Sequence, residues 1–131
     1  MAQVSARAVL ALGLFIGCGA SVRNAPTGPQ PDNAPQTQVQ FPPPPAKVEI
    51  LPDDPGKPCV WVDGHYNWVG RRWQWEAGGW FILPEGCYLA EARLVWAPEG
   101  STLYYTPPSF RFPGGKPCPE LKHCETKQAG P

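Results

Sequence analysis

The chain has 131 residues, among them 19 prolines, 14 glycines and six tryptophans, and its 11 basic and 11 acidic side chains give a formal net charge of zero. This length allows one small domain and excludes two ordinary ones. The balanced charge gives no electrostatic reason to expect nucleic acid or an anionic membrane surface as a partner.

The first residues are typical of an export signal. Arg7 precedes an apolar run, Ala8–Ile16, that is too short to span a membrane stably. The run leads into Phe15-Ile-Gly-Cys18, which resembles the lipobox of bacterial lipoproteins. The resemblance implies a signal peptide over residues 1–17 and an acylated Cys18 that anchors the chain, with the outer membrane as its destination. The alternative is ordinary secretion after cleavage behind Ala20, which would give a soluble periplasmic or secreted protein.

Residues 18–58 predict a proline-rich tether. Eleven prolines lie between Arg23 and Pro58, including the run Pro42–Pro45, and few large apolar side chains accompany them. Proline removes backbone donors and favours an extended chain, so we expect a semi-rigid spacer. A proline-rich recognition ligand is the alternative, and Val48–Ile50 could add a short edge strand.

Residues 59–112 predict a tryptophan-rich β-meander. Trp61-Val-Asp-Gly64-His-Tyr66 returns fourteen residues later as Trp75-Glu-Ala-Gly78-Gly-Trp80. Gly70-Arg71 suits a type II′ hairpin turn, which pairs Trp68 with Trp73 and places the large aromatics of the hairpin centre on one face.

Two further turns, Glu85-Gly86 and Glu99-Gly100, lie fourteen residues apart. Used as hairpin loops, they pair Trp75 with Trp96 and add Leu103 and Tyr105 to the same apolar face. The expected fold class is all-β: a small antiparallel meander of about four strands, strongly twisted or half-barrel, with a disordered proline-rich tether. Its apolar face needs a cover, which sheet curvature, the tail or a second subunit could provide.

The remaining residues, 113–131, form a proline- and cysteine-containing tail. Beyond Cys18 the chain has an even number of cysteines, which in an exported domain predicts two disulfides. We favour a pairing of Cys59 with Cys87 and of Cys118 with Cys124 over bridges from the sheet to the tail. A metal site using these thiols with His65 and His123 is the less favoured alternative, because the spacing lacks C-x-x-C pairs. No metal or other cofactor is expected.

The opposite face of the predicted sheet offers a candidate binding surface. It carries two large aromatics among polar side chains: Trp61, Trp80, Asp63, Glu91 and Arg93. An aromatic platform bordered by hydrogen-bonding groups suits stacking on sugar rings or peptide. The alternative is that the tether or the tail covers both tryptophans.

No catalytic motif is present, and the predicted pair of His65 and Glu76 is interpreted as a solvated cross-strand contact rather than an acid–base site. The units Trp61-x-x-Gly64-x-Tyr66-x-Trp68 and Trp75-x-x-Gly78-x-Trp80 resemble the tryptophan/tyrosine–glycine repeat proteins of bacteria, which are small exported or lipid-anchored chains. The resemblance covers Trp61 to Trp80 and implies an envelope location and a non-enzymatic role. We therefore expect a lipid-anchored structural or interaction module that associates with itself or with an envelope protein. The alternative function is a glycan- or peptidoglycan-binding module that uses exposed Trp61 and Trp80.

Overall fold

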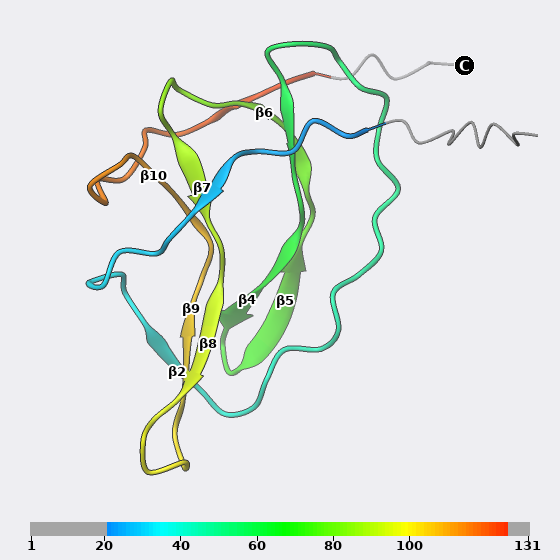
Figure 1. Ribbon diagram of the computed structural model, residues 1–131. Coiled ribbons are helices and arrows are strands. Elements are labelled where there is room, and N and C mark those ends of the chain that lie inside the picture. The colour runs from blue at the N-terminus through cyan, green and yellow to red at the C-terminus, as the bar shows by residue number, and fades with distance from the viewer. Residues whose placement is uncertain (1–20, 126–131) are drawn as a thin grey trace, which may run out of the picture.

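Figure 1 shows the computed structural model of the chain, which describes residues 21–125. The predicted signal peptide 1–17 and the predicted lipidation site Cys18 lie outside the described residues, as does the end of the tail. Within the described range all regular structure is β, which confirms the predicted class. No helix in this range is long and apolar enough to cross a membrane. The strands are β1 (Thr27–Gly28), β2 (Thr37–Val39), β3 (Val60–Val62), β4 (His65–Val69), β5 (Arg72–Glu76), β6 (Gly79–Ile82), β7 (Tyr88–Ala90), β8 (Arg93–Trp96), β9 (Leu103–Thr106), β10 (Ser109–Arg111) and β11 (Lys122–His123).

The aromatic repeat forms one long hairpin in the predicted register. β3 pairs with β6 and β4 pairs with β5, so that Trp68 lies opposite Trp73. At the turn, Gly70 and Arg71 both have positive φ, 57° and 68°. This is the pattern of a type I′ turn and corrects the predicted type II′ turn. Both types join two strands through two residues, so the register is the same.

The predicted strand pairing across the Glu85–Gly86 turn is wrong. The turn itself forms, and Cys87 donates its N–H to the carbonyl oxygen of Pro84 at 3.0 Å. The chain then leaves the hairpin, because β11 from the tail occupies the free edge of β6, while β7 pairs with β1 and β10. In place of one continuous meander, the described residues form four small sheets, none of which closes on itself.

The turn at Glu99–Gly100 joins β8 to β9 in the predicted register, with Trp96 opposite Leu103. β2 pairs with the other side of β9, which places Val39 opposite Leu103 as well. The strand order β2-β9-β8 leaves β8 at an edge. The core on this sheet consists of Val39, Leu103 and Tyr105, with Trp68 and Trp73 of the hairpin packed against it.

The proline-rich segment differs from the predicted tether over part of its length. β1 pairs in parallel with β7, and β2 pairs with β9 (Figure 1). Their prolines lie outside the paired residues, so the ladder donors of Thr27–Gly28 and Thr37–Val39 remain available. The predicted edge strand at Val48–Ile50 does not form, and the side chains of Val48 and Ile50 are almost fully exposed. Part of the segment thus covers the sheets, as the apolar face requires.

The disulfide pairing that we favoured from the sequence is wrong, and both bridges join the body of the fold to the tail. Cys59 is bonded to Cys124, and Cys87 is bonded to Cys118, each with a Cα–Cα distance of 6.3 Å. The reason is the course of the chain, which carries Cys87 away from β3 while β11 comes to lie beside β6. The bridges fix the tail where it completes the sheet.

Candidate functional site

The predicted aromatic platform is not a surface. Trp61 and Trp80 are only 3% and 4% exposed, and their rings meet edge to face at 5.5 Å between centroids. The Trp61 indole N–H donates to Asp63 at 2.7 Å, and that of Trp80 donates to the Pro52 carbonyl at 3.1 Å. Backbone bonds join Trp61 to Arg23 and Ala25, so the N-terminal segment is the cover that the sequence left as the alternative.

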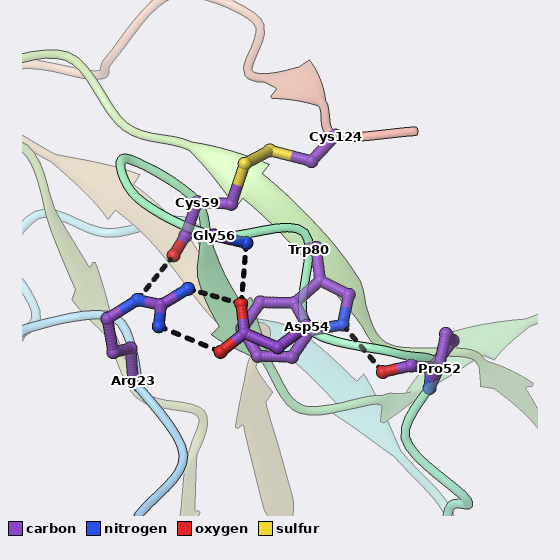
Figure 2. Close-up of polar contacts among 7 residues, drawn as sticks. All are labelled: Arg23, Pro52, Asp54, Gly56, Cys59, Trp80 and Cys124. Carbon is purple, nitrogen blue, oxygen red and sulfur yellow. Dashed lines mark hydrogen bonds and ion pairs between the residues drawn. A yellow bond between two sulfur atoms is a disulfide. The ribbon is translucent and has the colours of Figure 1, made fainter. Parts of the chain in front are cut away.

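An ion pair holds this cover in place (Figure 2). Arg23 and Asp54 form a bidentate pair, in which Nη1 donates to Oδ2 at 2.7 Å, and Arg23 Nε also donates to the Cys59 carbonyl at 3.2 Å. The hydrogen bond from Arg23, together with one from the Gly56 N–H, lowers the pKa of Asp54 below its ordinary value of 3.8. The Arg23 guanidinium also lies 5.8 Å from the centre of the Trp80 ring. The ion pair thereby holds two parts of the proline-rich segment, one at Arg23 and one at Asp54, against the buried Trp80 side chain.

The glycines of the two repeat units meet at one carboxylate. Gly64 donates its N–H to Glu49 Oε1 at 2.6 Å, and Gly78 donates its N–H to Glu49 Oε2 at 2.7 Å. Each glycine also packs against the tryptophan of the other unit, so that an added Cβ would lie 2.5 Å from Trp75 at Gly64 and 2.8 Å from Trp61 at Gly78. Glu49 was not predicted as a functional or structural residue, although it lies between two apolar residues in an otherwise polar and proline-rich stretch.

Three of the five residues of the predicted binding surface line a shared hollow. Trp61, Asp63 and Glu91 line this hollow of about 270 Å³, and Asp63 and Glu91 also line a second hollow of about 180 Å³. Trp80 and Arg93 do not line either hollow. Taken singly, the volume of each hollow lies below the roughly 300–1,000 Å³ of ordinary small-molecule sites.

Two titratable contacts at the β4–β5 hairpin, one within it and one from β9, join strands to one another. His65 Nε2 lies 3.4 Å from Glu76 Oε2 across the β4–β5 pair, as predicted, and the Glu76 side chain is 62% exposed. The Tyr105 hydroxyl donates to the Tyr66 carbonyl at 2.7 Å, and burial raises the pKa of Tyr105 above 10.0. Among residues 21–125, no three His, Cys, Asp or Glu side chains cluster so as to hold a metal ion.

Strand β8 carries a run of three exposed apolar side chains. Leu94, Val95 and Trp96 are 40%, 45% and 54% exposed, and they are consecutive. The predicted contact of Trp96 with Trp75 is absent, because β6 and β7 do not pair. The unbroken apolar run in Arg93-Leu-Val-Trp96 is typical of a strand that is buried on both faces, so the sequence pattern did not indicate this exposure.

The backbone of β8 is also open. Ala97 donates its N–H to the Thr102 carbonyl at 2.7 Å, just beyond the end of the strand. Hydrogen-bonded and non-hydrogen-bonded pairs alternate along an antiparallel ladder, so Val95 bonds to β9 whereas Leu94 and Trp96 do not. The N–H and C=O groups of Leu94 and Trp96 therefore point away from β9, and within the described chain no strand pairs with that edge. β8 is the candidate functional site.

Comparison with known protein families, with characterised proteins and with solved structures found no match. The resemblance to the tryptophan/tyrosine–glycine repeat proteins therefore remains a prediction from the motif at Trp61–Trp80.

Proposed function

We propose that this protein is a lipid-anchored structural or protein-interaction module of the bacterial cell envelope, held on the outer membrane through Cys18 and without catalytic activity. The lipobox-like sequence Phe15–Cys18 supports the anchor. The two bridges formed by the other cysteines support an oxidising compartment, because disulfides rarely persist in the cytosol. The resemblance of the repeat to exported envelope proteins supports the same location.

The observation that carries the interaction role is the edge of β8. Soluble proteins usually protect an edge strand with charge, proline, a bulge or a covering segment. β8 has three consecutive exposed apolar side chains and two residues with outward-pointing backbone groups. Exposed apolar surface of this kind marks interaction sites, and an open strand edge accepts another strand. Glycan binding through exposed Trp61 and Trp80 is not carried forward, because both side chains are buried.

The anchor can be tested by metabolic labelling of the full chain in a Gram-negative bacterium with a palmitate analogue, followed by membrane fractionation. The wild-type chain should take up the label and sediment with the outer membrane. Cys18→Ser should abolish the label and release the protein into the soluble periplasmic fraction. Cys118→Ser is the matched control and should keep the label, because only the cysteine at the predicted cleavage site is a substrate. An unlabelled wild-type chain, or equal labelling of Cys18→Ser, would refute the anchor.

A further inference from the structure

The open edge of β8 limits what can pair with it. Within β8, only Leu94 and Trp96 have N–H and C=O groups that point outward. The next residues in the same alternation lie outside the strand: Ala92 before it, and after it Pro98, which has no N–H group to donate. A partner strand therefore finds two complete backbone positions on this edge, separated by Val95.

A second copy of β8 fits these two positions. In an antiparallel pair related by a two-fold axis, Leu94 of each copy can lie opposite Trp96 of the other, so that every outward N–H and C=O of both strands is used. Val95 then lies opposite itself at the axis, in a closely spaced pair without hydrogen bonds. Registers that place Leu94 opposite Leu94 or Trp96 opposite Trp96 leave one of these residues opposite Ala92 or Pro98 instead.

The side chains suit the same register on both faces of the sheet. Leu94 and Trp96 lie opposite Tyr105 and Leu103 of β9, so they share the face that carries the buried core cluster. Pairing two copies would continue that apolar layer from one sheet into the next. On the other face, Val95 lies beside Tyr104, and two valines would meet at the axis.

Charge does not oppose this pairing. The only charged residue of β8 is Arg93, which in this register lies opposite Ala97 of the other copy. The formal net charge of the chain is zero, so two copies do not repel one another at long range. The two-fold arrangement uses the β8 edge of each copy, so this contact is closed at a dimer.

We propose that β8 pairs with β8 of a second copy of this chain, with Leu94 opposite Trp96, to form a continuous six-stranded sheet from two β2-β9-β8 sheets. This inference rests on the proposed function. A single short strand gives a small interface and a weak, transient association in solution. Anchoring both copies in one membrane would raise their effective concentration and make that association productive.

The first test measures the oligomeric state of the full chain carrying Cys18→Ser, by sedimentation velocity from about 10 µM to about 1 mM, the range in which a weak interface associates without the anchor. The parent should show reversible, concentration-dependent dimers. Val95→Glu should raise the dimer Kd by about 10-fold or more, because two carboxylates would face each other at the axis. Val69→Glu is the matched control: Val69 is a valine of similar exposure, 48%, at the far end of β4, and its variant should dimerise like the parent.

The second test fixes the register and does not depend on the folding of a charged variant. In the same parent, Val95→Cys should form a covalent dimer under mild oxidation, because disulfides suit the closely spaced pair. Val69→Cys should not. Stronger crosslinking by Trp96→Cys than by Val95→Cys would overturn the register.

The remaining outcomes separate this inference from the proposed function. A parent that stays monomeric over the whole range, or equal effects of Val95→Glu and Val69→Glu, would overturn pairing with a second copy. A monomeric parent that binds another envelope protein through β8 would overturn the dimer and leave the interaction role intact. A wild-type chain that takes up no palmitate label would refute the anchor without affecting the dimer measured in solution.

Discussion

Gly64 and Gly78 donate their backbone N–H groups to the two oxygens of the same carboxylate, that of Glu49. This contact explains the W-x-x-G spacing of the repeat in physical terms. Each unit supplies a glycine that the tryptophan of the other unit packs against, and each glycine leaves its amide free for a side chain from outside the hairpin. The repeat is thus a pair of reciprocal contacts, closed by a residue that belongs to neither unit.

Removing that carboxylate should destabilise the fold. Glu49→Ala leaves two partly buried N–H groups without their acceptor, and we expect the free energy of unfolding to fall by about 2 kcal/mol or more. Glu49→Gln should have an intermediate effect, because an amide can accept from only one of the two glycines. Denaturant unfolding followed by tryptophan fluorescence measures both. Glu85→Ala, at an exposed turn, is the control, and equal midpoints for Glu49→Ala and Glu85→Ala would contradict the role of Glu49.

Two neighbouring glycines should respond differently to the same substitution. At Gly78 an added Cβ would clash with the Val62 carbonyl oxygen and lie 2.8 Å from both the Gly64 nitrogen and the Trp61 ring. Because backbone cannot move aside, Gly78→Ala should cost at least the upper part of the roughly 1–3 kcal/mol range for overpacking. At Gly79 the nearest atom is 3.1 Å away on the Phe81 ring, which can rotate, so Gly79→Ala should cost less. Thermal unfolding of the two variants tests the order, and a larger loss for Gly79→Ala would refute it.

The ion pair of Arg23 with Asp54 should make stability depend on acid. The pKa of Asp54 is lowered in the folded state, first by the hydrogen bond from Arg23, so its stabilising contribution is present above the ordinary value of 3.8. The contribution is lost as the pH falls through the folded pKa, where both states become protonated. Asp54→Asn should therefore be less stable than wild type at neutral pH, and the difference should shrink with acid.

Urea midpoints of both proteins from neutral pH to about pH 2 measure this difference. Arg23→Gln is the matched background, in which most of the pH-dependent effect of Asp54→Asn should disappear. The hydrogen bond from the Gly56 N–H accounts for what remains. A difference that persists unchanged in the Arg23→Gln background would show that another partner lowers the pKa.

The disulfide pairing can be read directly by mass spectrometry. Trypsin cleaves after Lys and Arg except before Pro, and the sites in this chain place the four cysteines in separate peptides. Without reduction, the peptide containing Cys59 should be linked to the one containing Cys124, and that of Cys87 to that of Cys118. The expected peptide pairs are 48–71 with 123–127 and 73–93 with 112–122. A link between 112–122 and 123–127 would instead support the pairing that the sequence suggested.

Local signals predicted the parts of the fold that are local. The glycine turns at Gly70 and Gly100 indicated the registers of two hairpins: Gly70-Arg71 is a two-residue loop, and the four-residue loop Pro98–Ser101 is centred on Glu99-Gly100 and so gives the predicted register. The same reasoning failed at Gly86, where the turn forms but the tail competes successfully for the edge of β6. Turn chemistry specifies a reversal of the chain and does not specify which strand then occupies a neighbouring edge.

The candidate site was not predictable from these signals. Trp61 and Trp80 are covered by Arg23 and the Pro52–Asp54 stretch, which are distant in sequence and whose composition resembles a tether. β1 and β2 are two and three residues long, too short for any periodicity to indicate them. Exposure of Trp96 follows from the absence of a neighbour on β8, which only the complete topology reveals.

The two bridges also set an order of events during biogenesis. Each joins an earlier cysteine to one in the last part of the chain, Cys118 or Cys124. A chain that emerges from its amino end therefore presents Cys59 and Cys87 as free thiols until almost all of it has been delivered. During that interval a link between these two would be a wrong one, which oxidation can form and exchange must undo. The correct bridges close only after delivery of the tail, so a disulfide isomerase should matter more to this protein than the small number of its cysteines would suggest.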